Sequence, residues 1–353
     1  MIAAAGFWRG KRVFVTGHTG FKGAWLCAWL DRLGALVFGL ALPSDTEPSL
    51  CRLLGIEQLV ESLHADIRDA DRLGRAMTGF APDIVLHLAA QALVRRSYRD
   101  PAGTVATNVM GTINLLEAVR STPSVRAVIV VTSDKCYENR ESPLPYREGD
   151  ALGGADPYSA SKAGAELVAA AWRQSFFADG RIALATARAG NVIGGGDWAE
   201  DRLIPDCIAS LAAGRPIEIR NPNATRPWQH VLDPLSGYLR LAERLFTAGA
   251  GFARPWNFGP ATEEIRPVSW IADAIIARWG GGGSWIAGDL AGPHESGLLA
   301  VDPSLARAEL GWSPRLRLDE ALSWTVDWYR RHLEGEPADR LVGAQVDAYE
   351  ALP

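Results

Sequence analysis

The sequence has few of the features that mark metal-binding, secreted or membrane proteins. Its four cysteines, Cys27, Cys51, Cys136 and Cys207, lie too far apart for paired metal ligands, so we predict free thiols and no metal. No apolar run reaches the roughly 18 residues of a membrane span. The N-terminus lacks the basic start and the long apolar core of a signal peptide, so we expect a cytoplasmic protein.

Positive charge is also scarce. The net charge is −5, and no run of Lys and Arg offers a footprint for nucleic acid or for an anionic membrane surface. At 353 residues, with 48% hydrophobic residues, the chain is long enough for a large core and for two lobes. These numbers favour a globular protein that acts on a small molecule.

The first chemical signal is a glycine-rich turn between a strand and a helix. Residues 11–16 read as a buried strand and residues 24–33 as a helix, and between them the glycines follow the spacing G-x-x-G-x-x-G. Glycines there let the backbone approach a pyrophosphate at the positive end of the helix. The predicted cofactor-binding residues of this turn are Gly17, Thr19, Gly20, Phe21, Lys22 and Gly23.

The second strand, residues 35–42, indicates which dinucleotide binds. Its end normally contacts the adenosine ribose, and no Arg or Lys lies between Arg32 and Arg52 to receive a 2′-phosphate. This pattern favours NAD over NADP as the cofactor. The acid usually found at the end of this strand is displaced to Asp45, if it is present at all.

Further positions at strand ends complete the predicted cofactor site. Asp66 either meets the adenine amino group or is the N-cap of the helix predicted at residues 70–80. Residues 83–90 form a fourth strand that ends in small residues, and Asn108 stands at the predicted start of a helix over residues 109–119. The remaining cofactor-binding candidates are Ile67, Leu88, Ala89, Ala90 and Asn108.

The candidate catalytic residues follow a buried strand at residues 128–132. Ser133, Asp134 and Lys135 come directly after it, where ligands gather in open parallel sheets. Tyr158 and Lys162 stand one turn apart at the start of a helix predicted through residue 171. An ammonium beside a phenol favours the phenolate and lowers the phenol's pKa, which makes Tyr158 a candidate general base that also borders the cofactor together with Lys162.

Strands alternate with helices through the first half, which predicts an α/β fold with a doubly wound parallel sheet of the Rossmann type. After Arg188 the chain turns into a glycine-rich loop, and a smaller, mostly C-terminal α/β lobe is expected to bind substrate. We predict an NAD-binding domain at residues 1–187, with a return near 229–260, and a substrate lobe at 188–228 and 261–353. Most of the thirteen tryptophans, such as Trp25 and Trp29, have the helical spacing of core residues, and only Trp198 is assigned to substrate.

Together these segments resemble the extended short-chain dehydrogenase/reductase family, and within it the nucleotide-sugar 4,6-dehydratases of the CDP-glucose type. The resemblance covers residues 8–329. The widely shared motifs are Val15-Thr-Gly-His-Thr-Gly-Phe-Lys-Gly23 and Tyr158-Ser-Ala-Ser-Lys162. The motifs that resemble the CDP-glucose branch in particular are Thr132-Ser-Asp-Lys135 and Gly190-Asn-Val-Ile-Gly-Gly-Gly-Asp-Trp198. Most relatives have Glu where this chain has Lys135.

The resemblance implies a reaction and a role for each catalytic residue. Tyr158 and Ser133 act on the C4 hydroxyl of CDP-glucose while NAD takes the hydride, and Asp134 protonates the departing C6 oxygen while Lys135 takes the C5 proton. It implies a precursor of dideoxy sugars in surface polysaccharide, and a homodimer or homotetramer paired through the helices beginning near Asn108 and Tyr158. The implied substrate-binding residues are Gln91, Ser133, Arg188, Asn191, Trp198, Arg220 and Arg226.

Three alternatives remain open at this point. Another nucleotide-sugar 4,6-dehydratase or a sugar 4-epimerase shares the fold, although an epimerase has no need of Asp134. A non-catalytic NAD-sensing protein could use the same scaffold, but it has no reason to keep Ser133, Asp134, Tyr158 and Lys162 together. The identity of the C5 base is open as well, because an ammonium such as Lys135 is a base only when its pKa is lowered.

Overall fold

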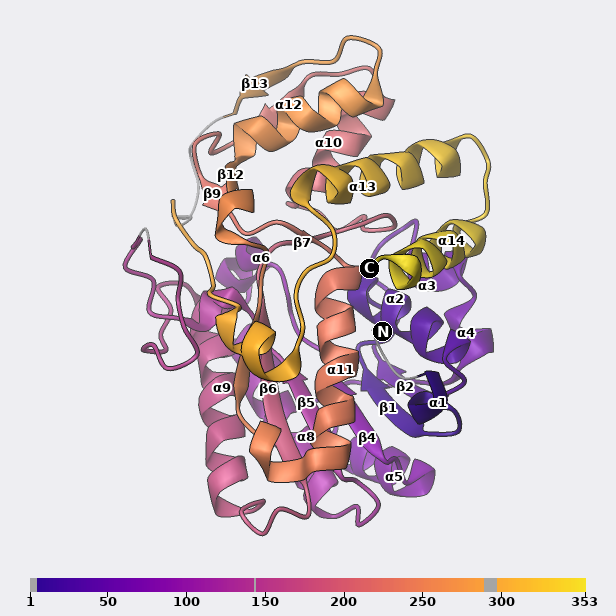
Figure 1. Cartoon of the computed structure of the whole chain (residues 1–353), viewed down its shortest axis with the longest axis vertical. Coiled ribbons are helices and arrows are strands. Elements are labelled where there is room, and N and C mark those ends of the chain that lie inside the picture. The colour runs from indigo at the N-terminus through magenta and orange to yellow at the C-terminus, as the bar shows by residue number, and fades with distance from the viewer. Residues whose placement is uncertain (1–4, 143, 289–296) are drawn as a thin grey trace.

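The computed structural model describes residues 5–142, 144–288 and 297–353 and contains a seven-stranded parallel sheet (Figure 1). Its strand order is β3-β2-β1-β4-β5-β6-β11, and each pair of neighbours is parallel. The strands are β1 (Arg12–Thr16), β2 (Leu36–Ala41), β3 (Glu61–His64), β4 (Ile84–His87), β5 (Ala127–Val131), β6 (Ala183–Ala189) and β11 (Pro255–Phe258). The predicted doubly wound fold is confirmed, and the strand order reverses between β1 and β4.

The two faces of the sheet bury different side chains, because neighbouring residues of a strand point in opposite directions. Val13 and Val15 of β1 belong to the larger apolar cluster, whereas Phe14 between them belongs to the second. The larger cluster includes α2 (Phe21–Arg32) and α11 (Leu232–Ala248); the second includes α5 (Ala70–Phe80), α8 (Gly111–Arg120) and α9 (Pro157–Ser175). Strands buried on both faces explain the unbroken apolar runs of the sequence.

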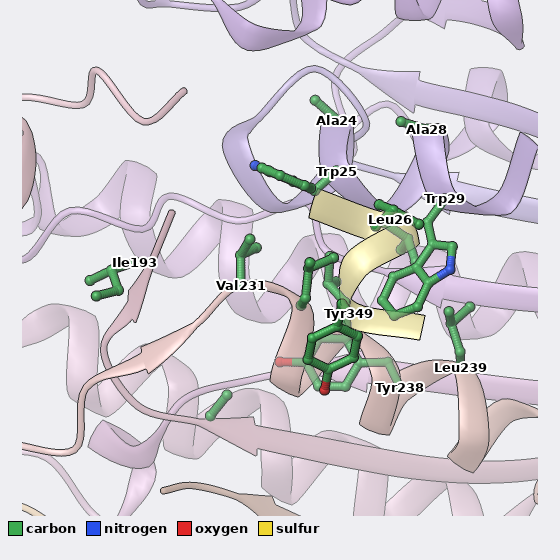
Figure 2. Close-up of a cluster of buried hydrophobic side chains, with 14 of the residues drawn as sticks. Ala24, Trp25, Leu26, Ala28, Trp29, Ile193, Val231, Tyr238, Leu239 and Tyr349 are labelled. Carbon is green, nitrogen blue, oxygen red and sulfur yellow. The ribbon is translucent and has the colours of Figure 1, made fainter. Parts of the chain in front are cut away.

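The C-terminal helix packs against α2, the helix that follows β1. Trp29 of α2 meets Tyr349 of α14 (Ala338–Ala351) edge to face at 5.8 Å, and both rings lie in the buried cluster drawn in Figure 2. Trp25 and Trp29 are fully buried, which confirms their assignment to the core. The C-terminal part of the chain contains α13 (Leu318–Leu333), followed by α14. The domain boundaries given above stay a prediction, and α14 contacts α2 across them.

The smaller lobe lies beyond the carboxyl ends of the strands, at the top of Figure 1. It contains α10 (Leu203–Ala212), β8 (Ile217–Ile219), α12 (Val268–Trp279) and β13 (Trp285–Ala287), with β8 and β13 paired in parallel. Short two-residue strands connect it to the sheet: β7 (Val192–Ile193) pairs with β10 (Gln229–His230), and β9 (Thr225–Arg226) pairs with β12 (Arg266–Pro267). The remaining helical and 3₁₀ segments are α1 (Ala5–Trp8), α3 (Leu50–Leu53), α4 (Ile56–Leu59), α6 (Val94–Arg99), α7 (Pro101–Val105), η1 (Ala106–Met110), η2 (Asp134–Cys136), η3 (Gly249–Phe252), η4 (Thr262–Glu264) and η5 (Ala306–Leu310).

A buried ion pair and two hydrogen bonds join α9 to β6 and to the end of β5. Glu166 accepts from the Arg188 guanidinium of β6 at 2.7 Å, and the two side chains are 2% and 3% exposed. The same carboxylate accepts the hydroxyls of Thr132, directly after β5, and of Thr186 in β6. Arg188 was predicted to bind substrate; that is wrong, because its guanidinium is held by Glu166, by the Tyr137 hydroxyl and by a backbone carbonyl.

Replacing Arg188 by Met should lower the free energy of unfolding by about 3–5 kcal/mol, because the Glu166 carboxylate would stay buried without its counter-charge. Urea unfolding followed by circular dichroism measures this change. Arg52→Met serves as the control, because it removes one side of an exposed pair with Glu47 and should cost at most about 1 kcal/mol. An equal loss in both variants would contradict the structural role of the buried pair.

Candidate active site

A single cleft of about 680 Å³ runs along the carboxyl ends of the strands. It extends from the glycine-rich turn after β1, past the ends of β4 and β5, to the loop after β6 and to β8 and β9. All but two of the predicted site residues line it; the exceptions are Asn108 and Arg188. Segments that are far apart in the sequence therefore meet in one space, at the point where the strand order reverses.

The glycine-rich turn fits a dinucleotide. Gly17 has φ +78°, and a Cβ on it would stand 2.7 Å from the backbone nitrogen of Ala89, so the turn and the end of β4 pass as close as two backbones can. Gly20 precedes α2 and, within the described residues, no side chain caps this helix. Its first-turn amides are thus available to an anion at the positive end of the helix dipole. The residues present therefore fit a bound NAD.

The structure excludes one of the two interpretations of Asp66. The N-cap of α5 is Asp69, whose carboxylate accepts from the backbone nitrogen of Arg72 at 3.0 Å. The N-cap interpretation of Asp66 is therefore wrong. Asp66 lines the cleft instead, together with Ile67, and its carboxylate pairs with Arg68 at 2.6 Å. The Arg68 hydrogen bond lowers the pKa of Asp66, so this carboxylate is charged at neutral pH.

Asn108 lies behind the cleft rather than at the start of a helix. The helical segment already begins at Pro101, and Asn108 falls in η1, a π-helical turn within it. Its side-chain oxygen accepts from the Gln91 backbone nitrogen at 2.8 Å, and its amide donates to the Ser161 hydroxyl at 2.8 Å. Asn108 therefore joins the loop after β4 to α9, and the expectation that it stands at a helix start is corrected.

The catalytic candidates converge after β5 and on the first turns of α9. Ser133 is the N-cap of η2, its hydroxyl donates to Asp134 Oδ1 at 3.0 Å, and it also hydrogen-bonds the Tyr158 phenol. Asp134 is 2% exposed, and its Oδ2 has no hydrogen-bond partner among the described residues. Burial raises the pKa of Asp134 despite the nearby charges of Lys135, Arg226 and Lys22, which favours a protonated carboxyl able to donate.

Tyr158 and Lys162 are both buried on α9, but their charges are not those expected from the sequence. Burial raises the pKa of Tyr158 to about 12, and the Ser133 hydrogen bond only partly opposes this. Lys162 donates to the backbone oxygen of Val131 at 3.3 Å, and burial lowers its pKa to about 8. The predicted lowering of the phenol's pKa is therefore not found, because desolvation of the buried phenol raises its pKa.

The residues assigned to substrate, apart from Arg188, also line the cleft. Arg226 is buried, donates to the backbone oxygens of Thr225 and Gly297, and interacts electrostatically with Asp134. Arg220 pairs with Asp201 at 3.0 Å. Trp198 lines the cleft but also packs edge to face on Trp328 and Tyr329 of α13, at 5.9 and 6.0 Å. Gln91 and Asn191 are the remaining cleft residues of this set.

The sequence analysis missed four arginines of the cleft: Arg68, described above, and Arg95, Arg96 and Arg202. Arg202 precedes α10, pairs with Asp197 at 2.8 Å and acts electrostatically on the pKa of Tyr158. Arg95 and Arg96 belong to α6, and Arg96 pairs with the displaced acid Asp45 at 3.1 Å. The adjacent arginines shortly after the fourth strand were a usable signal, whereas nothing near Arg202 in the sequence pointed to the cleft.

Comparison with known proteins agrees with this geometry. Residues 13–252 match the model of the NAD dependent epimerase/dehydratase family. The chain is 51% identical to the CDP-glucose 4,6-dehydratase of Salmonella typhimurium strain LT2 over 335 residues, 94% of this chain and 93% of that protein. It is 30% identical to the UDP-glucose 4-epimerase of Mycolicibacterium smegmatis, over 90% of this chain and 98% of that one. The crystal structure of the dTDP-glucose 4,6-dehydratase DesIV from Streptomyces venezuelae, with NAD and TYD bound, superposes with a TM-score of 0.77 at 25% identity and covers 92% of this chain and 98% of its own.

Asp66 and Asp69 make a matched pair of variants that separates binding from helix capping. Asp66→Ala should weaken NADH binding about tenfold, because a charged hydrogen-bond acceptor is lost from the cleft, and should leave stability nearly unchanged. Asp69→Ala should leave NADH binding nearly unchanged and lower the free energy of unfolding by about 1 kcal/mol. NADH fluorescence titration and urea unfolding measure the two effects. Unchanged NADH affinity in Asp66→Ala would show that Asp66 makes no contact with the cofactor.

Proposed function

Because the chain belongs to the NAD dependent epimerase/dehydratase family, we propose that it is a hydro-lyase that converts CDP-glucose to CDP-4-keto-6-deoxyglucose and water. The observation that carries this function is the meeting of Ser133, Asp134, Lys135, Tyr158 and Lys162 in one cleft beside a dinucleotide-binding turn. The 51% identity to a CDP-glucose 4,6-dehydratase over nearly the whole chain supports the choice of nucleotide.

Oxidation at C4 depends on Tyr158 and Ser133. Bound NAD supplies the redox chemistry, since it accepts a hydride from C4 and later returns it to C6. Tyr158 takes the proton of the C4 hydroxyl, and Ser133, hydrogen-bonded to the phenol, orients the same oxygen. Since burial raises the pKa of Tyr158 to about 12, its ionisation would be favoured by the positive charge of a bound NAD⁺.

Loss of water from C5 and C6 requires an acid and a base, and η2 offers both. Asp134, whose pKa is raised by burial, is the acid that protonates the departing C6 oxygen, and its Oδ2, which has no hydrogen-bond partner within the described ranges, can carry that proton. Lys135, the next residue, also lines the cleft and is the base for the C5 proton, which the C4 ketone has made acidic. An epimerase has no use for this pair, so Asp134 supports the dehydratase over that alternative.

Substrate binding is assigned to cleft residues outside the glycine-rich turn. Arg226 offers its guanidinium to the diphosphate, and its burial beside Asp134 puts it near the reacting sugar. Asn191 and Gln91 bind the sugar and its hydroxyls, and Arg220 and Trp198 flank the nucleoside. The stacking of Trp198 on α13 leaves it partly buried, which suits a wall of the site better than a mobile lid.

The protein is further proposed to act in the cytoplasm as a homodimer or homotetramer, in the supply of dideoxy sugars for lipopolysaccharide. The described residues contain no helix able to span a membrane. Apolar side chains are exposed along the helices expected to pair: Val105 at 42%, Met110 at 49% and Leu167 at 60%. Since α9 packs on α7 and η1, these side chains lie on neighbouring helices, as a self-complementary interface would require.

The first test incubates the purified protein with CDP-glucose and measures the alkali-induced absorbance of a 4-keto-6-deoxy sugar. GDP-mannose and UDP-glucose are run in parallel. We expect product from CDP-glucose alone. Product from another nucleotide would keep the reaction and overturn the cytidine assignment, whereas no keto sugar from any of them would contradict the dehydratase.

Asp134→Asn tests the acid directly. The amide keeps the size of the side chain and can still form hydrogen bonds, but it has no acidic proton. Water loss should therefore slow by about 10²–10⁴-fold while oxidation at C4 continues. Stopped-flow absorbance at the NADH band should show reduced cofactor accumulating on addition of CDP-glucose. Because the acid works only when protonated, wild-type activity should fall as pH rises through the raised pKa of Asp134. Loss of oxidation and dehydration together would assign Asp134 to substrate binding instead.

A further inference from the structure

Gly190 lies beside the catalytic candidate Asp134, although the two residues are far apart in the sequence. Gly190 directly follows β6 and Asp134 follows β5, and these strands pair in parallel, so both residues lie at the same edge of the sheet. Pro227, between β9 and β10, reaches the same place, because the Gln229 backbone nitrogen donates to the Asn191 backbone oxygen at 3.0 Å. Three segments of the chain therefore meet around one carboxyl group.

The space around Gly190, and not its backbone conformation, requires a glycine. Its φ lies outside the left-handed region in which glycine is favoured. A Cβ at this position, however, would stand 2.5 Å from Cγ of Pro227 and 2.9 Å from Oδ2 of Asp134. Both distances are shorter than van der Waals contact. Any side chain here would therefore have to displace either the Pro227 ring or the Asp134 carboxyl group.

This close contact keeps water away from one oxygen of Asp134. The Cα of Gly190 and the ring of Pro227 are apolar, and Oδ2 has no hydrogen-bond partner among the described residues. The other oxygen, Oδ1, accepts from the Ser133 hydroxyl at 3.0 Å, and the residue as a whole is 2% exposed. An oxygen without water or a donor destabilises the charged carboxylate, so the protonated form is favoured.

Exclusion of water is also the largest influence on the charge of Asp134. The titratable groups that face it come from η2, α2, β9 and α9, and they are Lys135, Cys136, Lys22, Arg226 and Tyr158. The three cations among them lower the pKa of Asp134, yet burial raises it overall. If water reached the carboxyl group, the cations would have the larger effect and the pKa would fall.

We propose that Gly190 is a positioning residue for the proposed dehydration: because it has no side chain, the Asp134 carboxyl group can lie dry against it and against Pro227 and present its proton to the C6 oxygen. The inference rests on the proposed function, in which Asp134 is the acid. In that step the C5 proton goes to Lys135, the electron pair of the C5–H bond forms the C5–C6 double bond, and the C6–O bond breaks. The departing oxygen takes the proton of Asp134 and leaves as water.

Gly190→Ala tests this role by adding a single methyl group. Displacing the acid should slow formation of the keto sugar from CDP-glucose by about 10²-fold, while oxidation at C4 continues. Stopped-flow absorbance should then show NADH accumulating. The fall of activity with rising pH should occur at lower pH than in the wild type, because a hydrated carboxyl group loses its proton more readily.

Gly259→Ala is the matched control. Gly259 directly follows β11, the strand beside β6, its φ is also outside the left-handed region, and it does not line the cleft. A Cβ there would stand 2.7 Å from Cγ2 of Val301, so the variant crowds an apolar side chain to a similar degree. It should lower stability in urea unfolding, but NADH should not accumulate and the pH dependence should match the wild type.

Two outcomes would overturn the inference. Equal slowing of C4 oxidation and water loss, without accumulated NADH, would mean that Gly190 shapes the substrate site as a whole. Unchanged rates would mean that Asp134 does not need this space. If Gly190→Ala does not fold, as judged by circular dichroism, Gly190→Ala combined with Pro227→Ala is compared with Pro227→Ala alone, since loss of the ring leaves the contact with Asp134. Failure of the proposed function is distinguishable, because the wild type itself would then form no keto sugar.

Discussion

The buried pair between Glu166 and Arg188 is the constraint on which the arrangement of the site depends. Glu166 lies one turn beyond Lys162 on α9, and it is bound to β6 through Arg188 and Thr186 and to the end of β5 through Thr132. Thr132 directly precedes Ser133, so a single carboxylate fixes both catalytic segments relative to each other. Because a charge 2% exposed is tolerated only with its counter-charge, the spacing of α9 and β5 has little freedom to vary.

The cleft contains four titratable side chains whose pKa values are shifted by burial. The pKa of Asp134 and that of Tyr158 are raised, while those of Lys162 and Lys22 are lowered to about 8 and 7. All four shifts have the same first cause, desolvation, and all four favour the neutral form. Such a site is poised for proton transfer, because each group can change its protonation state when substrate and cofactor bring their own charges.

Some features could be predicted from the sequence because their causes are local. The apolar runs of β1, β4 and β5 and the glycine turn after β1 indicated a Rossmann sheet and a dinucleotide site, and the helix at Ala70–Phe80 has the predicted bounds. Whether Asp66 or Asp69 caps this helix was harder to predict, because both carboxylates precede the helix and only backbone geometry shows which one caps it. Arg188 was misassigned because its place in a motif does not show that it pairs with the Glu166 carboxylate, 22 residues earlier in the chain.

By itself, the sequence determined the fold class and the NAD cofactor and supplied the candidate catalytic side chains, because spacing of one turn, strand-end position and glycine content act over a few residues. Only the tertiary structure decided which charges share a space. It brought Lys22 and Arg202 to the catalytic groups, Arg96 to Asp45, and Arg188 away from the cleft into the core. The physical reason is that desolvation and Coulomb energy depend on burial and on distances in three dimensions, and neither quantity can be read from a linear sequence.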